Sequence, residues 1–517
     1  MTKTLRAFPA LCLIGLVFVA AGCGSTTAGS GTDTAKLAPP SSFVYFEANI
    51  DPTGDQETGI RSILADLPGS GPPQQRIDDL IEKAAKSDKT SKIDYLKDVK
   101  PWLGDKAAVF AAQPKAGSTS PPWAILVATT DEGKAKDTIT KGTESSDRKA
   151  SYRGTDYVVD KDKTAVGTID GFFVAGSEPG LKAAVDASQD QSLSESDRYK
   201  QAIKGATEDR VGLLYEDLGG LVQAVAGASG QSLGPAAPFI GRLFGGKPVV
   251  ATIRAEEQAL VIDGSFLPAS NLFAGLGKST PLLDDAPGDS WLALGASDFG
   301  ATLKGLVGLA ASALGGEQAL NQQLKSATGL DLQQDILSWI GDVAFFVSGD
   351  SKDTIGGGAL IQTKDPATSK NTLTKLAALA AKSGGLKVSA YNAGGAEGYR
   401  LESPSLPRPI IAAQAGDKVA VTYGEEAAKA ALGASGSGLT DSPSFKSAAD
   451  KLGAAYTPSL YVSVPPILRL AESFGAGGAS YGKAKPYLTV LDYLIAGGAE
   501  SGGAAKSRTR IGFKPHE

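Results

Sequence analysis

Apolar residues recur along most of the chain with the spacings of short strands and amphipathic helices. Short β-branched or aromatic runs bounded by turn residues predict strands at 43–49, 107–112, 123–129, 164–169, 172–175 and 211–215. Apolar positions three and four apart, most with a charged opposite face, predict helices at 75–86, 132–141, 178–187 and 218–226. Runs 249–254 and 260–266, separated by a short polar turn, predict a hairpin. The pattern favours an α+β fold, an antiparallel or mixed sheet packed with helices.

This pattern occurs twice in the same order, which indicates a repeated domain. The matching segments are 44–51 with 291–298, 93–105 with 330–342, and 172–185 with 419–432. We therefore expect two tandem copies of one α+β domain, at 43–268 and 286–517, with a junction near 268–285.

The strongest match between the copies is an aromatic-Gly-Asp motif between a helix and a strand. Its residues are Trp102, Gly104 and Asp105 in the first copy and Trp339, Gly341 and Asp342 in the second. We expect the glycines to take a positive φ and end the helices, the tryptophans to cover the edge of the core, and the aspartates to cap the turns. A paired aromatic and carboxylate ligand site is the alternative.

The first residues have the layout of an export signal. Lys3 and Arg6 precede an apolar run at 7–21, and small residues lead to Cys23. The run is shorter than the roughly 20 apolar residues that span a bilayer. The ending Val-Ala-Ala-Gly-Cys resembles the lipobox of bacterial lipoproteins, in which the chain is cut before the cysteine and its thiol receives a diacylglyceryl group. The lipobox usually has Leu, Val or Ile where this chain has Ala20.

The cysteine content supports lipidation of Cys23. The chain holds two cysteines, Cys12 and Cys23, and Cys12 would leave with the signal, so the mature protein has no disulfide. Two acyl chains give stable anchoring. We expect a signal peptide at 1–22, a lipidated cysteine with a flexible Gly/Ser/Thr-rich tether at 23–42, and a protein anchored to the outer face of the cytoplasmic membrane or elsewhere in the cell envelope. An ordinary secretory signal with an unmodified cysteine is the alternative.

The two aromatic-Gly-Asp blocks, the first strand ending in Asp51 and the lipoprotein start together resemble the bacterial envelope family that carries the domain of unknown function 3352. The resemblance covers both copies. It implies an exported, often membrane-attached protein without an established activity.

The residue types needed for several chemistries are missing. The single histidine is His516, so serine or cysteine catalysis has no base in the body of the chain and an imidazole or thiolate metal site has no ligands. Carboxylate-only calcium or magnesium sites and acid-base pairs stay open among 56 acidic residues. Segment 274–280 ends like a phosphate-binding loop, but Leu272 stands where that motif needs glycine. We expect no catalytic residue, metal or cofactor.

The net charge of −5 and the absence of a basic cluster argue against nucleic acid as a partner. Apolar segments 218–244 and 299–314 are expected to form buried helices or the wall of an apolar cavity. The leading hypothesis is a non-enzymatic, membrane-anchored envelope lipoprotein whose duplicated body binds a lipid, another apolar ligand or an envelope protein. The alternatives are a solute-binding lipoprotein of a transporter and a carboxylate-dependent hydrolase of envelope polymers.

Overall fold

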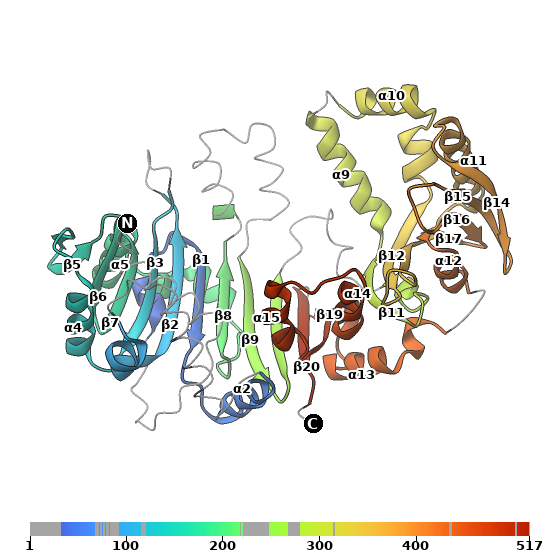
Figure 1. Ribbon diagram of the computed structural model, residues 1–517. Coiled ribbons are helices and arrows are strands. Elements are labelled where there is room, and N and C mark those ends of the chain that lie inside the picture. Colours follow the sequence, from blue (N-terminus) through green and yellow to red (C-terminus); the bar gives the residue numbers. More distant parts are fainter. Residues whose placement is uncertain are drawn as a thin grey trace. The chain divides into compact units, whose positions relative to one another are not determined.

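The computed structural model describes residues 33–67, 93–114, 120–217, 219–220, 248–266, 280–313, 316–433, 437–501 and 504–515, with positions 72, 75, 78 and 82. Contacts divide the chain into two compact units, the second running from Pro268 to Lys514 (Figure 1). Each unit contains helices and an antiparallel sheet, so the predicted α+β fold is confirmed.

The first unit is built on ten described strands. They are β1 (Ser42–Asn49), β2 (Leu103–Ala112), β3 (Trp123–Thr129), β4 (Arg148–Tyr152), β5 (Thr155–Val159), β6 (Thr164–Ile169), β7 (Phe172–Ser177), β8 (Gly212–Glu216), β9 (Val249–Glu256) and β10 (Ala259–Phe266). They pair antiparallel in the order β4-β5-β6-β7-β3-β2-β1-β8-β9-β10. The helical segments are η1 (Thr34–Leu37), α2 (Gly54–Asp66), η2 (Tyr95–Val99), η3 (Lys100–Trp102), α4 (Glu132–Gly142), α5 (Glu178–Gln189), η4 (Leu193–Glu195) and α6 (Asp197–Ile203).

Every strand predicted in the first copy is present, and the hairpin at 249–266 is β9 with β10. The helices predicted at 132–141 and 178–187 are α4 and α5. Most of the helices predicted at 75–86 and 218–226 lies outside the described residues. The pattern did not predict α2, β4 or β5; β4 is exposed or half-buried along its whole length, so it carries no apolar signal.

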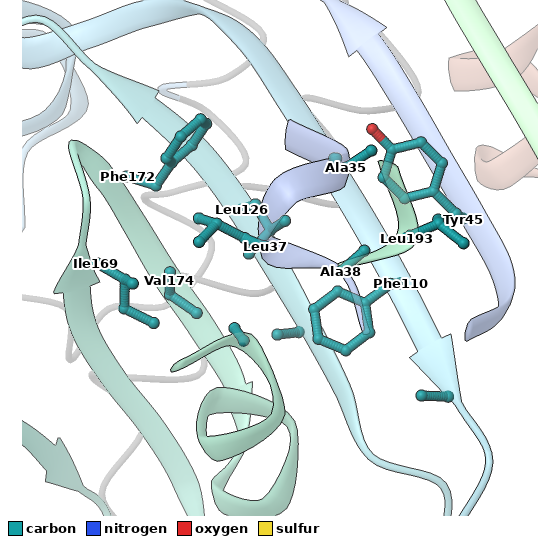
Figure 2. Close-up of a cluster of buried hydrophobic side chains, with 14 of the residues drawn as sticks. Ala35, Leu37, Ala38, Tyr45, Phe110, Leu126, Ile169, Phe172, Val174 and Leu193 are labelled. Carbon is teal, nitrogen blue, oxygen red and sulfur yellow. The ribbon is translucent and has the colours of Figure 1, made fainter. Parts of the chain in front are cut away.

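One core cluster of the first unit lies on one face of its sheet and includes a segment that the composition had assigned to the tether (Figure 2). Leu37 of η1 is 2% exposed and packs among Phe110, Leu126 and Val174. The prediction of a flexible tether through residue 42 is therefore wrong for the described residues 33–42. This polar stretch is ordered because Leu37 and the alanines beside it are buried, and because the hydroxyl of Thr34 forms buried hydrogen bonds with Tyr45 and Glu47.

Thr34 is held in a small buried polar network. Its Oγ1 lies 2.6 Å from Tyr45 Oη and donates to Glu47 Oε2 at 2.9 Å, and Tyr45 Oη donates to the same carboxylate oxygen at 3.1 Å. Hydrogen bonds among buried polar groups offset the cost of removing those groups from water. The network fixes η1 to β1.

The second unit also has ten described strands. They are β11 (Ser290–Ala296), β12 (Ile340–Ser348), β13 (Gly356–Thr363), β14 (Lys387–Ala393), β15 (Ala396–Glu402), β16 (Ile410–Ala415), β17 (Lys418–Tyr423), β18 (Thr457–Ser463), β19 (Leu491–Ser501) and β20 (Ala504–Phe513). They pair in the order β14-β15-β16-β17-β13-β12-β11-β18-β19-β20, which repeats the pairing of the first unit strand for strand. The helical segments are η5 (Pro281–Leu283), α9 (Phe299–Ala313), α10 (Glu317–Thr328), η6 (Leu332–Leu337), α11 (Pro366–Lys382), α12 (Glu425–Ala431), η7 (Leu439–Asp441), α13 (Pro443–Leu452), α14 (Val464–Ser473) and α15 (Ala479–Leu488).

One face of the second sheet is covered by η5, α12 and α13. Phe346 of β12 is buried there with Leu283 of η5, Ala427 of α12 and Phe445 of α13. The predicted start of the second copy at 286 is too late, because η5 already belongs to this core. Within the described residues, no helix is both long and apolar enough to cross a membrane.

Candidate functional site

The two tryptophans of the repeated motif lie at the predicted junctions and are buried. Trp102 ends η3, and its indole N–H donates to the main-chain oxygen of Asp98 at 2.5 Å and to Thr138 Oγ1 at 3.0 Å. Trp339 lies directly before β12 and donates to the main-chain oxygen of Asp335 at 2.9 Å. Both indoles therefore bond the helical turn that precedes the strand.

The glycines of the motif have a different role from the one predicted. Neither Gly104 nor Gly341 takes a positive φ, and each lies within a strand rather than at a helix end. A Cβ on Gly104 would lie 2.7 Å from the main-chain oxygen of Ala128, and one on Gly341 would lie 2.8 Å from that of Gln362. These glycines are needed because the neighbouring backbone approaches too closely for a side chain.

The aspartate of the second motif, Asp342, bonds two segments that lie distant in the sequence. The carboxylate of Asp342 accepts the main-chain N–H of Asp298 at 2.7 Å and the hydroxyl of Thr280 at 2.8 Å. Asp105 is exposed in β2. Its negative charge acts on the nearby Asp51, whose carboxyl pKa is raised first by burial and then by this charge. The motif residues therefore hold strands and turns together, which favours the structural interpretation over a ligand site.

A polar cluster that sequence matching missed surrounds both tryptophans. In the second unit, Thr372 donates to the main-chain oxygen of Asp335 at 2.6 Å, and Lys375 Nζ lies 2.7 Å from the Asp335 carboxylate. The Lys375 ammonium holds the pKa of Asp335 below its ordinary value. The first unit repeats the arrangement with Thr138 and Lys141 on Asp98. In each unit the threonine and the lysine belong to a helix that follows the motif by about 40 positions in the sequence. No residue near the motif in the sequence therefore marks them.

The predicted lipidation site is not among the described residues. Cys23 and His516 lie outside the described residues, as does most of segment 274–280. Within the part of the chain that the structure describes, no group of three or more His, Cys, Asp or Glu side chains is arranged to hold a metal ion.

The second unit exposes apolar side chains on the sheet face opposite Phe346. Phe345 pairs with Ala359, Ala359 with Val421, and Val421 with Ala412, so these side chains share one face. We call this surface the open apolar face; its side chains, each half-buried or exposed, are Phe345, Val347, Ala359, Leu401, Ile410, Ala412, Val421 and Tyr423.

Two helices border the open apolar face without closing it. α9 packs on β12 and α11 on β15. The rings of Phe299 of α9 and Phe345 lie 5.9 Å apart, edge to face. Leu306 of α9 and Leu376 of α11 are themselves exposed. Each bordering helix thus carries an exposed leucine of its own.

The first unit buries the middle of the corresponding face, at Ile125, Val166 and Ala175. There Val109 pairs with Ile125, Ile125 with Ala175, and Ala175 with Val166, so Ala175 occupies the place of Val421. The sequence match of 172–185 with 419–432 makes Val174 the counterpart, one position too early. Ala175 is 0% exposed, whereas Val421 is 39% exposed. Burial of the middle of this face is thus compatible with the fold, and the second unit leaves Val421 exposed there.

A pocket of about 320 Å³ lies elsewhere in the second unit. Its lining joins the segment before β11, the ends of β12 and β13, Arg408, and α12. Because Ala427 of α12 packs with Phe346, this helix is on the sheet face opposite the open apolar face.

The strand order and helix placement define an α+β protein with a helix-backed antiparallel sheet in each unit. The family model described as "Protein of unknown function (DUF3352)" matches residues 10–481. The chain belongs to this family.

The similar solved structures share little sequence and little structure with this chain. Crystal forms IV, III and I of TP0453 match with 11%, 11% and 12% identity and TM-scores of 0.24, 0.24 and 0.23. They cover 47%, 46% and 46% of this chain and 85%, 81% and 80% of theirs. Similarity at this level carries no argument about fold or function. No curated protein matches the chain.

Proposed function

We propose that this protein is a non-enzymatic envelope lipoprotein, anchored through a diacylated Cys23, whose second unit binds the acyl chains of a lipid on the open apolar face. The observation that carries the proposal is the 39% exposure of Val421 at a position where the first unit buries Ala175 completely. Soluble surfaces rarely expose a contiguous apolar area unless something binds there.

The energetics favour an acyl chain as the occupant. Each buried methylene group contributes about 0.8 kcal/mol, so about ten of them would contribute about 8 kcal/mol before the costs of ordering the ligand. The face spans β12, β13, β17, β16 and β15, which at about 4.8 Å per strand spacing is a strip about 19 Å long. A strip of this shape suits an extended hydrocarbon chain.

The anchor would keep the first unit near a membrane. The lipobox-like ending at Cys23 supports export and lipidation to the outer face of the cytoplasmic membrane or another envelope membrane. Asp33 caps η1, which is fixed to the first unit. The chain between Cys23 and Asp33 can span at most about 36 Å when extended, so the first unit would stay within that reach of the bilayer.

We also propose that the body arose as two tandem copies of one domain. The identical pairing order of β1–β10 and β11–β20 and the repeated bonds of Trp102 and Trp339 support this proposal. Duplication explains why packing residues recur in both units, while a difference between them, such as the open apolar face, points to a function of one unit.

Native mass spectrometry of the protein purified from its own host tests the binding proposal. Wild type is expected to retain a lipid beyond its covalent acyl groups, and Val421→Asp is expected to lose it. Leu406→Asp is the matched control, since Leu406 belongs to the same unit and is also 39% exposed but lies outside the open apolar face. Retention of lipid by Val421→Asp, or recovery of a protein partner in place of lipid, would contradict the proposal.

The anchor is tested separately by membrane fractionation. Cys23→Ala should move the protein from the membrane pellet to the soluble fraction, because one or no acyl chain binds a bilayer only weakly. Cys12→Ala is the control, since that cysteine belongs to the expected signal and its replacement keeps the run apolar. A Cys23→Ala protein that remains in the pellet would contradict lipidation at this residue.

The pocket beside α12 favours a second candidate, the binding of a polar solute. Its lining includes charged side chains of both signs, which an apolar ligand does not need.

A further inference from the structure

The pocket of the second unit is built partly from a segment that the first unit lacks. β15 and β16 are joined by residues 403–409, whereas the corresponding strands β5 and β6 are joined by the shorter segment 160–163. Arg408 lies on the longer connection and lines the pocket. Because the shared fold does not need this connection, Arg408 calls for an explanation other than packing common to both units.

Arg408 is fixed by the backbone. Its Nη1 donates to the main-chain oxygens of Thr354 at 2.9 Å and Ile355 at 2.5 Å. A Cβ on Gly424, whose φ is +94°, would lie 2.9 Å from Arg408 Cζ, and one on Gly356 would lie 3.5 Å from Nη1. Glycine at position 424 leaves room for the guanidinium, so its placement is built into the surrounding chain, whereas the distance at Gly356 is an ordinary contact.

No described carboxylate neutralises Arg408, although two acidic residues line the same pocket. Within the described residues, Arg408 forms no ion pair, and its bonds to carbonyl oxygens use only Nη1. Glu426 is paired with Lys429 at 3.3 Å, and Asp289 is exposed. Within the described residues nothing bonds the second edge of the guanidinium, Nε with Nη2, and such an edge suits two-point bonding to a carboxylate.

We propose that this pocket binds a small zwitterion, an amino acid or short peptide, with its carboxylate on Arg408 and its ammonium group directed to Asp289 and Glu426. A simple anion would face two carboxylates, and a simple cation would face the guanidinium; a ligand with both charges complements both. A volume of about 320 Å³ admits a molecule of this size. The lining also supplies hydroxyl groups from Ser348, Thr354 and Ser437.

This site does not depend on the lipid-binding proposal, since α12, which lines the pocket, packs on the sheet face opposite the open apolar face. A protein that fails to bind lipid could therefore still bind the zwitterion, and the reverse, so the two proposals can fail separately.

Isothermal titration of the full mature chain with alanyl-alanine tests the site. We expect wild type to bind the dipeptide and Arg408→Gln to bind it at least tenfold more weakly. Arg469→Gln is the matched control, because Arg469 belongs to the same unit and pairs with Asp350 outside the pocket lining. It should bind as wild type does.

Changes to the ligand provide a test that does not depend on the folding of a variant. With wild type, the dipeptide amide, which lacks the carboxylate, and the N-acetyl dipeptide, which lacks the ammonium group, should each bind at least tenfold more weakly. With Arg408→Gln, the amide should cause little further loss, because both changes remove the same interaction. No heat change with wild type at about 10 mM dipeptide, where even millimolar binding would register, or equal binding of all three compounds, would overturn the proposal.

Discussion

Trp339 Nε1 donates a 2.9 Å hydrogen bond to the main-chain oxygen of Asp335, one turn earlier in the chain. The bond joins the end of η6 to the start of β12 inside a buried cluster. The equivalent bond in the first unit runs from Trp102 to Asp98. A tryptophan at this junction thus does more than cover the core, since its polar edge bonds a main-chain oxygen that also accepts a threonine hydroxyl in each unit.

Trp339→Phe and Trp102→Phe should each lower the free energy of unfolding by about 1–3 kcal/mol, because each keeps a ring but loses a buried hydrogen bond. Urea unfolding followed by circular dichroism measures the change. Trp123→Phe is the control, since the Trp123 indole is half-buried and has no hydrogen bond within the described residues. Equal effects at all three positions would argue against the bond as the cause.

Gly341→Ala should also destabilise the fold, by about 1–3 kcal/mol, because its Cβ would lie 2.8 Å from the main-chain oxygen of Gln362 and force the strands apart. Gly385→Ala is a suitable comparison, since a Cβ there meets nothing within 4 Å. Thermal unfolding of both variants should show a lowered midpoint for the first and an unchanged or raised one for the second. A neutral Gly341→Ala would mean that β12 and β13 separate without cost.

The carboxylate of Asp331 makes stability depend on pH in the acid range. The main-chain N–H of Gln334 and the side-chain amide of Asn321 hold the pKa of Asp331 at about 2, below its value of about 3.9 in an unfolded chain. Since the folded pKa is the lower one, the unfolded state binds protons first as the pH falls. The stabilisation is present above about pH 4 and is lost toward about pH 2.

Urea midpoints measured between about pH 6 and about pH 2 check this expectation. Asp331→Asn should be less stable than wild type at the upper end, and the difference should shrink as the pH falls. Asp353→Asn is the control, because the Asp353 side chain is 80% exposed in the same unit. A difference between wild type and Asp331→Asn that stays constant with pH would rule out titration of this carboxylate as the source.

Leu37→Ala should reduce the free energy of unfolding by about 2–4 kcal/mol, because it removes a side chain that is 2% exposed from the core of the first unit. Lys36→Ala, a change to the exposed neighbour in the same turn, should have an effect within about 0.5 kcal/mol. Guanidinium unfolding of the pair distinguishes an ordered η1 from a tether. If both substitutions were neutral, the segment would not contribute to the core.

The sequence by itself determined the local elements and their order. The strand predicted at 123–129 coincides with β3, and the helix predicted at 132–141 falls within α4, because alternation and helical periodicity are properties of neighbouring residues. The two aromatic-Gly-Asp blocks also indicated the family correctly, since the same motif is present in both halves of the chain. The same patterns could not reveal what each face packs against.

Only the tertiary structure decided which residues meet across long separations. Asp342 bonds Thr280, 62 positions away, and Gly341 is required by the approach of β13 rather than by a local turn. Val421 follows a strand pattern like that of its counterpart Ala175, yet one is exposed and the other is buried. Periodicity shows on which side of a strand a residue lies. Whether that side is covered depends on helices and strands that are distant in the sequence. The uncovered side is where a ligand can bind.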